Sequence, residues 1–220
     1  IENVDESDTP RTRRFALPIS LDVYARKCVV VGGDAEATDK AMRLVRAGAK
    51  VQVIATHIEP ALEAAVERGE LSWAARSVSA ADLNGAMVVV VTPDEYDEAQ
   101  PIAKRARAGE FLLCVIDRPE LCTFAQPAVA QVGDLKIALS SGGRAPAVLK
   151  RLRQDLQEAL DTAPVRSFIE AMGALRDITA PGKRSSRLRQ AVKGLKLSVQ
   201  IELPSWFREG RTSPEGDEEA

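Results

Sequence analysis

Over the first half of the chain, the hydrophobic pattern switches repeatedly between strand and helix. Apolar runs at residues 28–31, 86–91 and 111–116 show almost no polar alternation, which is typical of strands buried on both faces of a parallel sheet. Between the first two runs, apolar residues recur at helical spacing from Ala37 until Gly48 ends the helix. The remaining predicted elements are strands at residues 51–54 and 71–73 and helices at residues 60–68 and 94–108. The last helix either starts near Pro101 or kinks there. This alternation predicts an α/β fold with a Rossmann-like, doubly wound parallel sheet.

The pattern changes after residue 122. Residues 123–132 and 135–140 flank Gly133 and Asp134, which indicates a hairpin. The helices predicted beyond it are residues 147–160, 165–178 and 186–203. The predicted parts are a flexible arm (1–14), a Rossmann-like dinucleotide-binding domain (15–121), a small α+β region (122–145), a helical domain (146–207) and a disordered tail (208–220).

Composition adds limits to this picture. The 220 residues are 45% hydrophobic and 28% charged, as expected of a globular protein with a real core, and the net charge of -2 argues against a general nucleic-acid binder. No apolar run approaches the roughly 18 residues of a membrane span, and no secretory signal is visible. We therefore expect a cytoplasmic protein with neither nucleic-acid nor membrane partners. Cys28, Cys114 and Cys122 form no metal-ligand pattern, so we expect reduced thiols and no resident metal.

The first candidate site is the turn at residues 32–36, Gly32-Gly33-Asp34-Ala35-Glu36. A strand, a tight turn and a helix start form the first unit of a dinucleotide-binding fold, in which helix N–H groups hold a pyrophosphate. Counted from Gly32, the second glycine of the G-x-G-x-x-[GA] motif is replaced by Asp34, which adds bulk and negative charge where phosphates approach. A plain α/β turn is the alternative interpretation.

Other candidates follow the carboxyl ends of strands, where ligands bind in open α/β sheets. Thr56 and His57 follow the second strand, Thr92 follows residues 86–91, and Asp117 follows residues 111–116. No carboxylate ends the second strand, where an NAD site usually holds the ribose. Asp117 could act as an acid or base, or it could be a turn residue. His57, the one histidine of the chain, cannot form a histidine metal cluster, and an exposed loop residue is the favoured alternative.

A second loop of small residues precedes the predicted helix at 147–160. Ser141, Gly142, Gly143 and Arg144 offer a hydroxyl, a guanidinium and helix N-terminal N–H groups to an anion, and the alternative is a capped helix start. A basic run at residues 183–196 could contact a polycarboxylate, although such runs are more often solvated helix faces.

Two stretches carry a resemblance to a known family. They are Val115-Ile-Asp-Arg-Pro-Glu-Leu-Cys-Thr-Phe-Ala-Gln-Pro-Ala128 and Gly133-Asp-Leu-Lys-Ile-Ala-Leu-Ser-Ser-Gly-Gly143, the second followed by Ala145-Pro146 and a helix. Their aspartate, proline, phenylalanine-x-x-proline-alanine and serine-x-glycine-glycine positions resemble the precorrin-2 dehydrogenase / sirohydrochlorin ferrochelatase family. That family includes the amino-terminal part of bifunctional siroheme synthase.

The resemblance implies a homodimer that assembles through residues 122–145 and oxidises precorrin-2, a tetrapyrrole, to sirohydrochlorin with NAD⁺. Some members also insert Fe²⁺, which is a lyase reaction. The family's acid/base aspartate falls on Asp117 and its rim serine on Ser141, with NAD expected along residues 32–36 and at Thr56, His57 and Thr92. The positions at which this sequence departs from the family's pattern cluster around the expected cofactor site. The alternatives are therefore a member that has lost the dehydrogenase reaction and acts as a chelatase or a non-catalytic tetrapyrrole-binding protein, and a nucleotide-sensing module.

Overall fold

The structure is a computed structural model that describes residues 17–208. The predicted arm (1–14) lies outside the described residues, as does the predicted tail (208–220) apart from Arg208. The chain divides into two compact units, the first ending at Thr162 and the second starting at Ala163. This division falls one helix later than the predicted start of the helical domain at residue 146.

The first unit is built on a five-stranded parallel sheet with the order β3-β2-β1-β4-β5, which confirms the Rossmann-like fold. The strands are β1 (Lys27–Val31), β2 (Lys50–Ile54), β3 (Ser72–Ala74), β4 (Val88–Val91) and β5 (Leu112–Val115). The central strand β1 pairs with β2 on one side and β4 on the other, so that Cys28 lies opposite both Val51 and Val88. The crevice beyond the carboxyl ends of β1 and β4 is therefore the topological switch point, where ligands bind in such folds.

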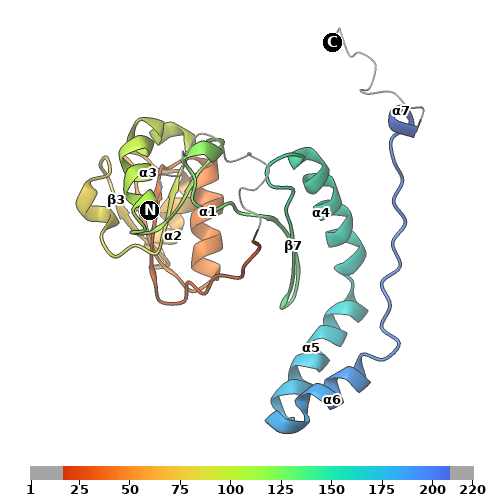
Figure 1. The fold of residues 1–220 in the computed structure, drawn as a ribbon. Helices are drawn as coiled ribbons and strands as arrows, with labels where there is room; N and C mark the ends of the chain where they lie inside the picture. The colour runs from red at the N-terminus through yellow and green to blue at the C-terminus, as the bar shows by residue number, and fades with distance from the viewer. Residues whose placement is uncertain (1–16, 209–220) are drawn as a thin grey trace, which may run out of the picture. The chain divides into compact units, whose positions relative to one another are not determined.

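Helices cover both faces of this sheet (Figure 1). They are α1 (Ala35–Arg46), α2 (Pro60–Glu67) and α3 (Ala99–Arg107), with short 3₁₀ turns η3 (Ala80–Leu83), η4 (Pro93–Glu98) and η5 (Pro119–Leu121). The predicted helix at 94–108 divides into η4 and α3, and the backbone leaves helical geometry at Glu95 within η4. Pro101 lies in the first turn of α3, where its missing N–H removes no helical hydrogen bond.

Two hydrophobic clusters form the core, one on each face of the sheet. Val29 and Val31 belong to the cluster under α3, whereas Cys28 and Val30 belong to the cluster under α1 and α2. Side chains alternate between the two faces of a strand, so consecutive residues of β1 belong to opposite clusters. Because both faces of the sheet are covered, every residue from 28 to 31 is apolar. Cys28 and Cys114 are buried and free, which confirms their prediction as small hydrophobic side chains. Burial raises the pKa of the Cys28 thiol and keeps it neutral.

The predicted hairpin is confirmed. β6 (Ala128–Val132) and β7 (Leu135–Leu139) are antiparallel, and Gly133 supplies the left-handed backbone (φ +56°) in the turn. The next helix, α4 (Pro146–Leu160), packs on β6, and Gln157 exchanges two 2.8 Å hydrogen bonds with the backbone of Gln131.

The second unit contains α5 (Ala163–Asp177), α6 (Pro181–Ala191) and α7 (Ser205–Arg208). The predicted helix at 186–203 is correct to Ala191 and wrong beyond it, since α6 ends there and non-helical chain continues to Pro204. Apolar residues recur at every second position from Leu195 to Leu203, a period that suits extended chain better than a helix. None of the helices described is long and apolar enough to cross a membrane.

Candidate functional site

The glycine turn at the end of β1 is shaped by its neighbours. Gly32 has φ +128°, and a Cβ there would lie 1.9 Å from the Thr92 hydroxyl oxygen. A Cβ on Gly33 would lie 1.9 Å from the carbonyl oxygen of His57. Both positions therefore require glycine for packing alone. The turn brings together Gly32, Gly33, His57 and the buried Thr92 from the ends of three strands, as the sequence predicts.

Asp34 caps α1. Its carboxylate accepts the N–H of Ala37 at 2.7 Å, and its carbonyl accepts the Thr38 hydroxyl at 3.0 Å. This is a normal N-cap, but it occupies a helix N–H that could otherwise bind a phosphate. Ala35 is exposed in the first turn beside it, with its N–H at the helix start.

The other acids of α1 are paired with bases on the same helix. Glu36 lies 3.2 Å from Lys40, and Asp39 lies 2.9 Å from Arg43 and 3.2 Å from Lys40. Partial burial opposes ionisation of Asp39, but the hydrogen bonds from Arg43 and Lys40 outweigh it and lower its pKa. Much of the negative charge of these two acids is therefore compensated by the basic side chains of the same helix.

Thr56 and His57 follow β2 and are exposed, with the Thr56 hydroxyl 3.2 Å from Nδ1 of His57. The segment after β2 reads Ala55-Thr56-His57 and presents no carboxylate. The polar side chains that directly follow β2 are thus a hydroxyl and an imidazole. Within residues 17–208, no cluster of three or more histidine, cysteine or acidic side chains is placed to hold a metal ion.

Asp117 follows β5 after one residue and is exposed, with a left-handed backbone (φ +58°) that is uncommon outside glycine and asparagine or aspartate. Tyr96 lies beside it and donates a hydrogen bond to the Ile116 carbonyl at 2.5 Å. Burial raises the pKa of the Tyr96 phenol, and the carboxylates of Asp117 and, more weakly, Asp34 add to this shift. Tyr96 is therefore within electrostatic reach of both sides of the crevice, a placement that the sequence analysis missed.

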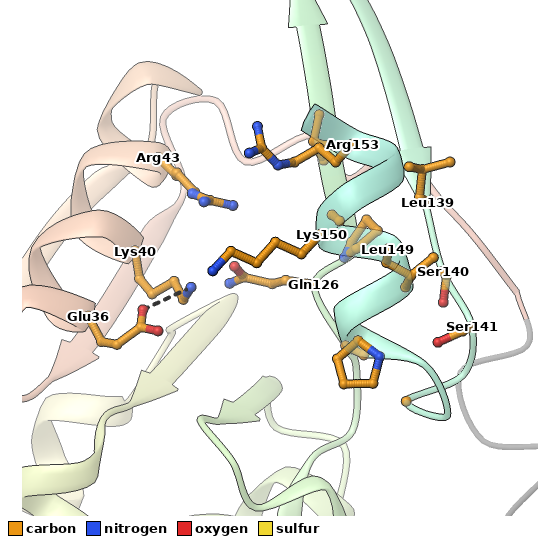
Figure 2. A pocket seen from close by; sticks show the side chains of 16 residues that line it. Glu36, Lys40, Arg43, Gln126, Leu139, Ser140, Ser141, Leu149, Lys150 and Arg153 are labelled. Atoms are coloured by element: carbon orange, nitrogen blue, oxygen red, sulfur yellow. Dashed lines mark ion pairs between the residues drawn. The ribbon is translucent and has the colours of Figure 1, made fainter. Parts of the chain in front are cut away.

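A cavity of about 730 Å³ lies between α1, the hairpin strands and α4. Four basic side chains line it, Lys40 and Arg43 from α1 and Lys150 and Arg153 from α4, and Figure 2 shows Lys150 pointing toward the α1 side chains. We call this the basic cavity. Glu36 is the acidic residue of its lining.

The predicted substrate loop contributes part of this lining. Ser141 and Gly143 line the basic cavity, whereas Gly142 and Arg144 are exposed and do not line it. The Ser141 hydroxyl accepts the N–H of Ala145 at 3.0 Å, so it also supports the start of α4. The sequence analysis missed all four basic residues. The available signal was their spacing, since residues three apart share one helix face.

Comparison with known proteins identifies the family to which the α/β domain belongs. Residues 19–128, half of the chain, match a family model described as "Putative NAD(P)-binding". The chain belongs to this NAD(P)-binding family. Siroheme synthase of Thiobacillus denitrificans is 36% identical over 171 residues, which cover 76% of this chain and 36% of that protein. Siroheme synthase of Methylobacillus flagellatus is 34% identical over 141 residues, covering 64% of this chain and 30% of that protein.

This member of the NAD(P)-binding family thus spans about a third of the length of these curated relatives. Their similarity confirms the predicted family resemblance. A solved structure of SirC, a precorrin-2 dehydrogenase, aligns with a TM-score of 0.66 and 21% identity over 80% of this chain and 89% of that chain. This likeness supports the shared fold.

The groups at the switch point of this family member are of the kinds that bind a dinucleotide. Gly32 and Gly33 let the chain turn tightly at the switch point, and the first turn of α1 presents helix N–H groups beside them. Thr56 and His57 offer polar groups after β2. The Asp34 carboxylate is the feature of this turn that opposes a phosphate.

Proposed function

We propose that this chain oxidises precorrin-2 to sirohydrochlorin with NAD⁺, a step of siroheme formation. The observation that carries the proposal is the position of Asp117. It stands exposed at the carboxyl end of β5, on the same sheet edge as the glycine turn, in a chain related to siroheme synthases. A carboxylate there lies at the sheet edge where ligands bind in such folds.

Bound NAD⁺ would supply the hydride acceptor. The turn at residues 32–36 would hold its pyrophosphate, and Thr56, His57 and Thr92 would border the rest. Asp117 accepts the proton that leaves the substrate when the hydride departs, and its exposure lets the proton pass on to water. The left-handed backbone of Asp117 is an uncommon conformation of the kind that clusters at functional sites.

Further features follow from the same proposal. Asp117 could also accept pyrrole protons if Fe²⁺ is a second substrate, which would make the chain a ferrochelatase as well. We propose a homodimer through residues 122–145 and a cytoplasmic location on the same basis. A second candidate function, a chelatase or tetrapyrrole-binding protein without the dehydrogenase reaction, is favoured by the Asp34 carboxylate at the helix N-terminus.

The test is NADH formation from freshly prepared precorrin-2 by the purified chain. Asp117→Asn keeps a residue that tolerates the left-handed backbone, and it should lower kcat by about 100-fold with an unchanged circular dichroism spectrum. Glu67→Gln, which changes an exposed acid at the end of α2, should leave kcat unchanged. Unchanged turnover in Asp117→Asn would remove Asp117 from the mechanism. NADH formation by neither the wild type nor the variants, in protein that still binds sirohydrochlorin, would favour the second candidate.

A further inference from the structure

The basic cavity concentrates positive charge in a chain whose net charge is -2. Its lining has four basic side chains and one acidic side chain. We propose that the basic cavity is the subsite that binds the peripheral carboxylates of the substrate, with Lys150 and Arg153 of α4 and Arg43 of α1 as the principal contacts. The identity of the ligand rests on the proposed function, but the chemistry of the cavity is independent of it.

The charges on the two sides of the cavity differ in how far they are neutralised. Lys40 is shared between Glu36 and Asp39, and Arg43 is paired with Asp39. Lys150 and Arg153 make no ion pair with any residue in the described part of the chain, although Arg151 on the same helix pairs with Asp155. The α4 side therefore carries positive charge that an anion in the cavity would neutralise.

The geometry favours a ligand with carboxylates on more than one edge. Figure 2 shows Lys40 and Arg43 reaching into the space from α1, and Lys150 and Arg153 from the opposite side. Gln126 lies between them, where its amide can bind a further oxygen. Charge-assisted hydrogen bonds from such groups are stronger than neutral ones, and an arginine can hold a carboxylate through two N–H groups.

The rest of the lining favours a small molecule with an apolar body. Leu139, Leu149, Pro127 and Val129 supply apolar surface, and the volume of about 730 Å³ is typical of a small-molecule pocket. An extended polyanion such as nucleic acid would need a basic surface longer than one pocket, and the net charge of the chain opposes it. The occupant that this lining fits is a small molecule with an apolar body and carboxylates at its edges.

The experiment titrates the wild-type chain with uroporphyrin, a stable and fully carboxylated porphyrin, in the absence of NAD⁺, and follows porphyrin fluorescence anisotropy. The double variant Lys150→Gln/Arg153→Gln should bind at least about tenfold more weakly. Arg151→Gln makes the same kind of charge change on the same helix outside the cavity, and it should bind as the wild type does. Coproporphyrin has fewer carboxylates, so it should bind more weakly and lose less affinity in the double variant.

Several outcomes would overturn the proposal. They are no binding of uroporphyrin, equal affinity in wild type and double variant, an equal loss in Arg151→Gln, and equally tight binding of a short DNA duplex through the same residues. Because the titration contains no NAD⁺, it is separate from the dehydrogenase assay. Loss of uroporphyrin binding in the double variant would support the cavity even if precorrin-2 yields no NADH, and that second result would count against the proposed function alone.

Discussion

Asp34 has two opposing effects at the start of α1. Its carboxylate accepts the Ala37 N–H at 2.7 Å and interacts favourably with the positive end of the helix dipole, so it stabilises the helix. A cofactor pyrophosphate would use the same helix end for the same reason. Helix stability and phosphate binding therefore compete for one set of N–H groups, and a residue without charge should shift the balance toward the phosphate.

We predict that Asp34→Gly raises the affinity for NAD⁺ by about tenfold, because it removes a like charge from the phosphate position. Asp34→Asn, which keeps the cap and loses the charge, should give part of this gain. Since glycine is a tolerable N-cap, the free energy of unfolding should fall by only a few tenths of a kcal/mol. Calorimetric titration and urea unfolding measure both effects. Glu63→Gln removes an acid from the first turn of α2 as a control, and an unchanged Kd in Asp34→Gly would contradict the prediction.

Among the elements, η3 shows how one carboxylate can hold a short turn together. Asp82 accepts two 2.7 Å hydrogen bonds from Arg76, and it accepts the N–H and hydroxyl of Ser79 at 2.8 and 2.7 Å. The side chain of Asp82 is 10% exposed. The Arg76 guanidinium, followed by Ser79, holds the pKa of this carboxyl well below its usual range, although desolvation opposes the shift.

The lowered pKa of Asp82 fixes the sign of the pH dependence of the free energy of unfolding. A carboxyl whose pKa is lowered by folding stabilises the protein above its unfolded pKa of about 3.9, and this contribution is lost as the pH falls toward the folded value. Asp82→Ala should therefore lower the free energy of unfolding by about 1–2 kcal/mol at pH 7 and by less at acid pH. Urea unfolding at neutral and acid pH measures the difference, with Asp97→Ala as an exposed control. An equal loss at both pH values would show that the ionised carboxylate is not responsible.

The sequence predicts elements well where one period dominates. The buried runs of β1, β4 and β5 cannot be amphipathic helices, and Gly133-Asp134 marks the hairpin, so these were predicted correctly. The prediction of a helix over residues 186–203 fails after Ala191, where the apolar residues alternate. Asp117 and the glycine turn could be found because strand ends meet at one edge of a parallel sheet. The basic cavity could not, since α1 and α4 are far apart in the sequence and only tertiary structure brings their lysines and arginines together.

Across the described chain, the buried core belongs to the first unit. All buried hydrophobic residues described lie between Val23 and Val132, and Thr179 is the buried residue of the second unit. Leu195, Leu197, Val199 and Ile201 in the second unit are each more than 60% exposed. Stability therefore comes mainly from the α/β sheet and its helices, while the second unit buries too little apolar surface to be stable by itself.

We predict that a chain ending at Thr162 unfolds cooperatively, with a midpoint within about 5 °C of the full chain, because the core residues and the sheet register are unchanged by the truncation. The complementary piece from Ala163 onward should show little helix by circular dichroism, since isolated short helices are marginal in water. Calorimetry of the first piece and circular dichroism of both provide the test. A broad or absent transition in the first piece would mean that the second unit supplies contacts on which the α/β core depends. A stable helical signal from the second piece would mean that local helix propensity and its few buried contacts are sufficient for folding.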